Sequence, residues 1–121
     1  MKILSIDDDA FERQTMLKEL ESRGFEVTSC SSGEEGVACA KKTKFDAIVS
    51  DLIMPGLSGE DLINELTAIP GYNEIPILIV TSSGKGSQFY KATNRKHFVL
   101  VKPVNHESLV RLIKLQVSEA S

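Results

Sequence analysis

Side chains that could hold a metal ion and a phosphoryl group follow the short apolar runs of this sequence. Asp7-Asp8-Asp9 comes directly after the first run and Asp51 after the third, while Thr81-Ser82 ends the fourth and Lys102-Pro103 the fifth. Two carboxylates about 4 Å apart repel each other, so clustered acids require raised pKa values or a cation. Open oxygen sites favour Mg²⁺, which keeps several waters and shares a phosphate. The lysine and threonine add donors for a phosphoryl group carried by Asp51.

A single aspartate at a strand end is more often a helix cap than a ligand. Asp9, followed by Ala10-Phe11-Glu12, is expected to be mainly such a cap. Chance is a poor explanation for five polar residues at the ends of four strands. These residues are Asp7, Asp8, Asp51, Thr81 and Lys102. We therefore expect a site at which these side chains meet.

These residues can meet only if the apolar runs are strands of one sheet. Four of the five runs are nearly continuous aliphatic stretches, which is typical of strands buried on both faces of a parallel sheet. The second run alternates in polarity, as an edge strand does. The predicted strands span Lys2 to Ile6, Phe25 to Cys30, Phe45 to Ser50, Ile77 to Thr81 and Phe98 to Lys102.

Amphipathic segments between the runs predict helices. Ser58 and Asp61 form a possible capping box for the third, Ser31 or Ser32 can cap the second, and Asn105 can cap the last. Gly84 and Gly86 precede the fourth, which has almost no aliphatic face, so we expect it to be short or mobile. The predicted helices span Phe11 to Arg23, Ser32 to Lys42, Gly59 to Ile69, Ser87 to Arg95 and about Asn105 to Ser118.

Strict alternation of strands and helices predicts an α/β fold, a doubly wound five-stranded parallel sheet with helices on both faces. Ligands of such sheets bind beyond the carboxyl ends of the strands, where the polar residues collect. The 121 residues, 41% hydrophobic and 26% charged, match one globular domain over 1–121.

Charge and composition exclude several classes of protein. A net charge of −3 offers no basic surface for a phosphate backbone, so direct nucleic-acid binding is not expected. No apolar run approaches the roughly 20 residues of a membrane span, and no signal peptide follows Met1, so we expect a cytoplasmic protein. Cys30 and Cys39 lack metal-ligand spacing and are expected to be reduced, partly buried thiols.

Four stretches resemble the receiver domains of two-component response regulators across nearly the whole chain. They are Ile3-Leu-Ser-Ile-Asp7-Asp8-Asp9, Asp46-Ala-Ile-Val-Ser-Asp51-Leu-Ile-Met-Pro55-Gly-Leu-Ser-Gly59, Pro76-Ile-Leu-Ile-Val-Thr81-Ser82 and Val101-Lys102-Pro103. The resemblance implies a flavodoxin-like sheet of strand order 2-1-3-4-5. It also implies a phosphoacceptor signalling domain and not an enzyme. Such a domain takes part in its own phosphorylation and dephosphorylation.

The resemblance further implies a role for each site residue. Asp51 would accept a phosphoryl group from the phosphohistidine of a sensor histidine kinase or histidine phosphotransfer protein. The domain would then signal by a conformational change, in some cases to a downstream effector protein. Mg²⁺ would be held by Asp7, Asp8, Asp51 and the Ile53 carbonyl. Thr81, Ser82 and Lys102 would contact the phosphoryl group, the bond before Pro103 would be cis, and Ile53 and Ser83 would tune dephosphorylation.

The chain departs from the family pattern in two places. Val99 stands where the family usually has Tyr or Phe, and Phe98 is one residue away, which places it on the other face of the strand. The second departure is the segment Gly84-Lys85-Gly86, which precedes a predicted helix without the usual aliphatic residues.

Charge is unevenly distributed along the chain. The segment from Lys85 to His97 has four basic residues and no acid, which is typical of a solvated helix face; a docking face for an acidic partner is the alternative.

Three other functions fit the sequence less well. A flavodoxin-like cofactor carrier would need a phosphate cradle where this chain has acids, and it would draw on aromatic residues that are scarce here. An aspartyl-phosphate phosphatase would need an acid at position 53, where this chain has Ile53. A receiver-like adaptor that acts by protein contact without phosphorylation remains the main alternative, because fold does not fix function.

Overall fold

The computed structural model describes residues 1–81 and 97–120. In these residues a helix follows each of the first three strands and the last one, and the sheet has the order β2-β1-β3-β4-β5 with every neighbouring pair parallel. The predicted fold class and strand order are therefore confirmed. The elements are β1 (Lys2–Ile6), α1 (Ala10–Glu21), β2 (Glu26–Cys30), α2 (Gly33–Lys42), β3 (Ala47–Asp51), α3 (Gly59–Thr67), β4 (Ile77–Thr81), β5 (His97–Val101) and α5 (His106–Ala120).

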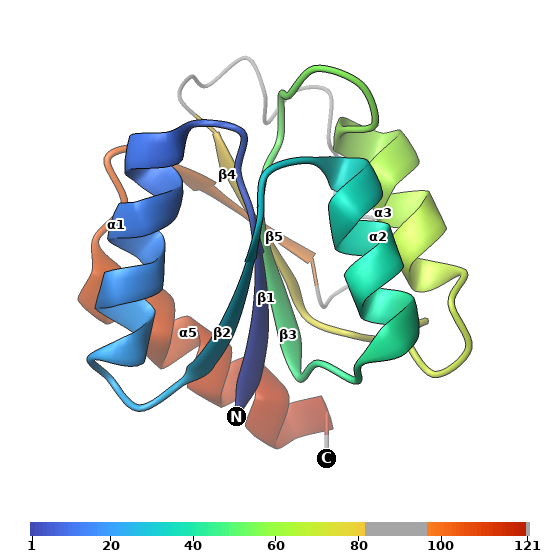
Figure 1. Ribbon diagram of the computed structural model, residues 1–121. Helices are drawn as coiled ribbons and strands as arrows, with labels where there is room; N and C mark the ends of the chain where they lie inside the picture. The colour runs from blue at the N-terminus through green and yellow to red at the C-terminus, as the bar shows by residue number, and fades with distance from the viewer. Residues whose placement is uncertain (82–96, 121) are drawn as a thin grey trace.

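The helices cover both faces of the sheet. Helices α1 and α5 lie on one face and α2 and α3 on the other, with the sheet twisting between them (Figure 1). Strands β1, β3 and β4 are buried along almost their whole length, whereas β2 alternates between exposed and more buried residues, as its edge position requires.

Each face of the sheet has its own core. Ile6, Ile48 and Ile79 pack with α2 and α3, whereas Ile3, Val49 and Leu78 pack with α1 and α5. Because side chains along a strand alternate between faces, strands that are apolar throughout supply both cores at once. This double burial fixes the register and therefore the level at which each strand ends.

Side-chain caps set the beginnings of three helices. Asp9 accepts from the Glu12 N–H at 2.9 Å, Ser32 from the Glu35 N–H at 3.1 Å, and Asn105 from the Ser108 N–H at 3.0 Å. These predicted caps are confirmed, and Ser32, not Ser31, caps α2.

The predicted capping box of α3 is wrong. Ser58 stands at the N-cap position, but its side chain makes no capping hydrogen bond. Gly59, the first residue of the helix, has a φ of +57°. This left-handed residue takes the first turn away from the right-handed geometry in which the hydroxyl of Ser58 and the side chain of Asp61 could satisfy each other's backbone N–H groups.

Element boundaries differ from prediction by one or two residues. Strand β3 begins at Ala47 and not at Phe45, whose N–H donates to the Tyr72 hydroxyl at 2.8 Å. Helix α1 includes Ala10 and ends two residues earlier than predicted, and α3 ends at Thr67. The predicted helix over 87–95, and with it the basic segment up to residue 96, lies outside the described residues.

The first turn of α2 lies against the loop that follows β3. A Cβ added to Gly33 would lie 2.1 Å from the carbonyl oxygen of Leu57, and Glu34 Oε2 accepts from the Leu57 N–H at 3.2 Å. One turn later, a Cβ on Gly36 would lie 2.4 Å from Cδ1 of Ile6. The two glycines therefore allow α2 to approach both β1 and the loop of residues 52–58.

Both cysteines are free thiols, as predicted. Cys30 is buried and Cys39 half-buried, with their sulfur atoms 3.5 Å apart. Burial, together with the neighbouring Cys39 thiol, raises the pKa of Cys30, which keeps this thiol protonated. Among the helices of the described residues, none is long and apolar enough to cross a membrane.

Candidate functional site

The strand register brings the predicted site residues to one edge of the sheet. Ile6 pairs with Ser50, so Asp7 and Asp51 stand at the same level, and Asp51 pairs with Val80. Thr81 pairs with Val101, so Thr81 lies one step and Lys102 two steps beyond Asp51. The backbone N–H of Lys102 donates to the Thr81 carbonyl at 2.7 Å, which extends the ladder to this residue.

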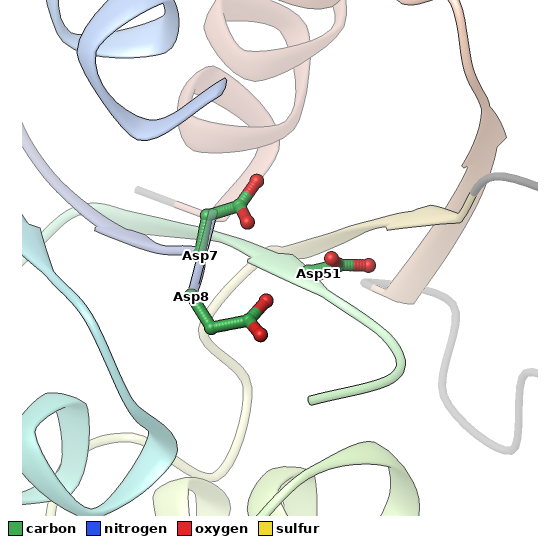
Figure 2. Close-up of side chains that lie close together, drawn as sticks. All are labelled: Asp7, Asp8 and Asp51. Atoms are coloured by element: carbon green, nitrogen blue, oxygen red, sulfur yellow. The ribbon is translucent and has the colours of Figure 1, made fainter. Parts of the chain in front are cut away.

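Three carboxylates gather at this edge. Asp7, Asp8 and Asp51 each offer an oxygen atom, and these atoms all lie within 4.8 Å of one another. Figure 2 shows the three side chains at the ends of β1 and β3. Asp8 is exposed, whereas Asp7 and Asp51 are partly buried. The donor set is entirely oxygen, which fits a hard divalent cation such as Mg²⁺ and does not fit a soft metal.

Two acids of the cluster have raised pKa values. Burial raises the pKa of Asp7 to about 6; the Asp9 N–H, which donates to Asp7 Oδ1 at 3.0 Å, opposes this rise, and the nearby charge of Asp51 adds to it. Burial also raises the pKa of Asp51, against the opposing effects of Lys102 and of the Leu52 and Ile53 N–H groups. A cation held between these carboxylates would oppose both shifts, because it favours their charged form.

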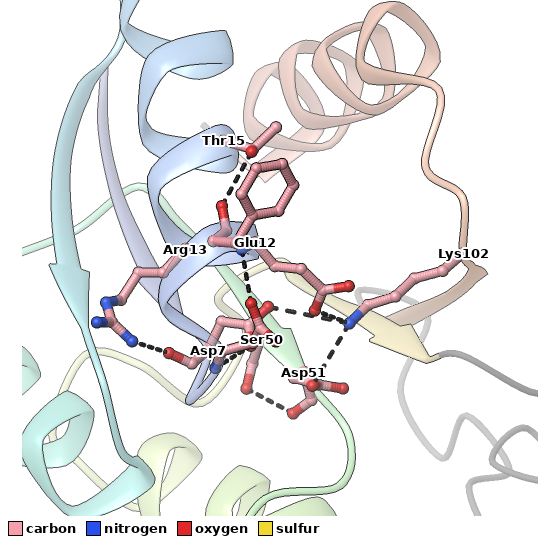
Figure 3. A network of polar contacts seen from close by, with 9 residues as sticks. Asp7, Glu12, Arg13, Thr15, Ser50, Asp51 and Lys102 are labelled. Atoms are coloured by element: carbon pink, nitrogen blue, oxygen red, sulfur yellow. Dashed lines mark hydrogen bonds and ion pairs between the residues drawn. The ribbon is translucent and has the colours of Figure 1, made fainter.

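Lys102 supplies a positive charge to the same cluster. Its Nζ lies 2.5 Å from Glu12 Oε2, 3.5 Å from Asp51 Oδ2 and 3.9 Å from Asp7 Oδ2 (Figure 3). Burial lowers the pKa of this ammonium group, but the Glu12 hydrogen bond and the charges of Asp51 and Asp7 outweigh burial and raise it overall. Lys102 therefore stays charged beside the cluster.

The first turn of α1 adds two residues that the sequence reasoning missed. Arg13 donates from its guanidinium to the Asp7 carbonyl at 2.8 Å, and Glu12 is the nearest acid to Lys102 among the described residues. Glu12 and Lys102 are 90 positions apart, so no local pattern could join them. The only sequence signal was that Glu12 lies three residues after the capping Asp9.

The remaining predicted residues fall at the same edge or outside the described chain. Thr81 is buried at the end of β4, and Ile53 lies in the loop after β3 with its side chain 68% exposed. The Lys102–Pro103 peptide bond is cis, as predicted. Ser82 and Ser83 lie beyond the described part of the chain.

Val99 and its neighbours in β5 face alternate cores of the sheet, as their one-residue spacing predicts. Val99 packs with the core beneath α2 and α3, whereas Leu100 packs with the core beneath α1 and α5. Phe98 therefore shares the face of Leu100, one residue out of step with Val99. Val99, and not Phe98, therefore stands at the position where the family usually has Tyr or Phe.

Comparison with known proteins identifies the family. Residues 3–114 match the model of the response regulator receiver domain. The chain belongs to this family. Its curated relatives include protein PilH of Pseudomonas aeruginosa, with 32% identity over 114 residues that cover 93% of each chain.

Solved receiver domains have the same fold. Chemotaxis protein CheY4 of Vibrio cholerae is 34% identical, with a TM-score of 0.83 over 94% of this chain and 96% of that one. The receiver domain of sensor histidine kinase PA1611 from P. aeruginosa is 25% identical, with a TM-score of 0.87 over 97% of each chain, and its structure has a magnesium ion coordinated in the active-site cleft. The chain is thus a receiver domain of the two-component response regulators, a signalling family whose members interact with histidine kinases and downstream effectors.

Proposed function

We propose that this receiver domain accepts a phosphoryl group on Asp51 from the phosphohistidine of a histidine kinase or phosphotransfer protein. The observation that carries the proposal is the position of Lys102, whose ammonium lies 3.5 Å from Asp51 Oδ2 and 3.9 Å from Asp7 Oδ2 at the edge where three acids meet. A lone carboxylate at a strand end would need neither the lysine nor the other acids.

Asp51 is the nucleophile in this proposal. One of its carboxylate oxygens forms a bond to phosphorus as the bond from phosphorus to the donor imidazole nitrogen breaks, and the imidazole leaves with the electron pair. Lys102 and the Thr81 hydroxyl contact the phosphoryl oxygens, and Ser82 is assigned to the same group. The protein contributes positioning and charge neutralisation to a loose transition state.

Asp7, Asp8, Asp51 and the Ile53 carbonyl are the proposed ligands of Mg²⁺. The fit is supported by the oxygen-only donor set and by the raised pKa values of Asp7 and Asp51. When bound, the ion neutralises negative charge that builds up between the phosphoryl group and the carboxylates.

Exposed apolar side chains beside the acids favour a protein as the phosphoryl donor. Phe11, in the first turn of α1, is 80% exposed, and Ile53 is 68% exposed. Large exposed apolar groups near a site are typical of protein contact surfaces. We also propose that residues 1–121 form a single domain and that the protein is cytoplasmic.

Mass spectrometry after treatment with acetyl phosphate and Mg²⁺ tests the proposal. We expect one phosphoryl group on the protein, lost in Asp51→Asn and retained in Asp46→Asn, whose carboxylate instead accepts from the Lys2 N–H at 2.7 Å. An unmodified protein, or equal labelling of Asp51→Asn, would favour the alternative of an adaptor that acts by contact alone.

A further inference from the structure

Glu12 is the acid nearest to the site lysine among the described residues. Its Oε2 lies 2.5 Å from Lys102 Nζ, a full ångström closer than Oδ2 of Asp51. Figure 3 shows Glu12 reaching the ammonium from α1, while Asp51 reaches it from β3. Lys102 thus lies between a carboxylate of the acid cluster and a carboxylate outside it.

The position of Glu12 is fixed by its backbone. The Glu12 N–H donates to Asp9 Oδ1 at 2.9 Å, and the next residue, Arg13, donates to the Asp7 carbonyl at 2.8 Å. The first turn of α1 is therefore attached at two points to the segment that carries the acids. Because the backbone of Glu12 is already held in place, little further conformational entropy is lost when its side chain contacts Lys102.

The contact involves a partly buried lysine and a more exposed acid. The Lys102 side chain is 19% exposed, the Glu12 side chain 41% and the Asp51 side chain 13%. All three line one pocket of about 210 Å³, together with Asp7. Lys102 and the carboxylates that compete for it therefore share one cavity.

A phosphoryl group on Asp51 would change which acceptors surround the Lys102 ammonium. It adds strong acceptor oxygens on the Asp51 side of the ammonium, and the lysine must approach them to neutralise their charge. Glu12 competes for the same donor from the α1 side. A ligand that requires Lys102 to move therefore works against the existing contact with Glu12.

We propose that Glu12 is a positioning residue that competes with the Asp51 phosphoryl group for Lys102 and thereby weakens phosphoryl binding at Asp51. This inference rests on the proposed function and extends it to a residue outside the acid cluster. Glu12 acts through Lys102 and has no contact with the phosphoryl group itself. Its effect should match that of a partly exposed ion pair, about three- to fivefold in affinity.

Binding of beryllofluoride, an analogue of the phosphoryl group, tests the proposal at saturating Mg²⁺ by isothermal titration calorimetry. Glu12→Gln removes the charge at the same side-chain length, and Glu12→Asp keeps the charge but shortens the side chain. We expect both variants to bind beryllofluoride about three- to fivefold more tightly than the parent. Glu19→Gln is the matched control, because Glu19 lies on the same helix and pairs with Arg23, away from the site.

The variants separate contact with Lys102 from simple repulsion. If repulsion by the Glu12 charge were the cause, Glu12→Asp would bind like the parent and only Glu12→Gln would bind more tightly, which would overturn the proposal. Unchanged or weaker binding by Glu12→Gln would also overturn it. A parent protein that binds no beryllofluoride would instead refute the function of Asp51 and, with it, the role of Glu12.

Discussion

The ammonium group of Lys102 lies 3.5 Å from Oδ2 of Asp51. Its charge opposes the rise in the Asp51 pKa that burial causes. We therefore expect Lys102→Gln to raise the pKa of Asp51 further, because burial would then act with one opposing charge fewer. Carbon-13 NMR titration of the aspartate carboxyl groups in metal-free protein measures this shift.

Lys114→Gln is the control for the titration. The Lys114→Gln substitution also removes a positive charge, but the Lys114 ammonium lies over the Phe25 ring, 5.9 Å from the ring centre. The Asp51 titration should be unchanged in Lys114→Gln. An equal shift in both variants would mean that net charge, and not the contact with Lys102, sets the pKa.

The pKa of Asp7 predicts how the stability of the metal-free protein depends on pH. Folding raises this pKa from 3.8 to about 6, so the folded state holds the proton more tightly than the unfolded chain. The free energy of unfolding contributed by Asp7 is therefore largest below about pH 4 and falls as the pH rises to 6. Asp7→Asn lacks this titration and keeps the side-chain shape.

Urea denaturation in EDTA at pH 4.5 and pH 7.5 measures the effect. The free energy of unfolding of Asp7→Asn, relative to the parent, should increase by on the order of 2 kcal/mol between the two pH values. Added Mg²⁺ should reduce the advantage at pH 7.5, because only the parent keeps all three carboxylates. An equal difference at both pH values would contradict the raised pKa.

We expect the phosphoryl group on Asp51 to be hydrolysed slowly because of the residue at position 53, Ile53. Water must attack the phosphorus opposite the Asp51 oxygen, and an apolar side chain two residues after Asp51 offers no hydrogen bond to orient it. Ile53→Asn should therefore dephosphorylate about tenfold faster. Because the Ile53 side chain is 68% exposed, the substitution should leave stability nearly unchanged.

The phosphorylated fraction followed over time by mass spectrometry in Mg²⁺ gives the rate. Ile53→Val is the control and should match the parent, since valine orients water no better than isoleucine. Ser83→Glu, alone or with Ile53→Asn, tests the second position assigned to this role. Equal lifetimes for the parent and Ile53→Asn would exclude water positioning at residue 53.

Replacement of Tyr72 should lower the stability of the fold at a point far from the site. The buried hydroxyl of Tyr72 donates to the Thr43 carbonyl at 2.7 Å and accepts from the Phe45 N–H at 2.8 Å, just before β3 begins. Tyr72→Phe would leave both backbone groups without this partner, at a cost of about 1–3 kcal/mol. Thermal or urea unfolding measures it; a loss within about 0.5 kcal/mol would indicate that water replaces the hydroxyl.

The fold could be predicted because its strands are apolar throughout. A run such as Ile77 to Thr81 has no exposed face, which only a covered parallel sheet can accommodate, and the segment is buried along its whole length. Boundaries were less predictable because tertiary contacts decide them. The hydroxyl of Tyr72 takes the Phe45 N–H, so β3 starts two residues later than its composition indicated.

The site could be predicted as far as strand ends define it. Asp7, Asp51 and Lys102 each end or follow a strand, and parallel register brings such positions together. Glu12 could not be predicted in the same way, because its role depends on where α1 lies relative to β5. The capping box at Ser58 failed because sequence does not reveal the left-handed backbone of Gly59.

Tolerance to amino-acid replacement should be unusually low at Gly33. The first turn of a helix normally accepts many residues, yet here any side chain would meet the carbonyl oxygen of Leu57, 2.1 Å from the position of a Cβ. That carbonyl belongs to the loop that joins Asp51 to α3 and carries Ile53. In a saturation library selected for signalling, substitutions at position 33 should therefore be depleted like those of the acid cluster, although Gly33 carries no functional group.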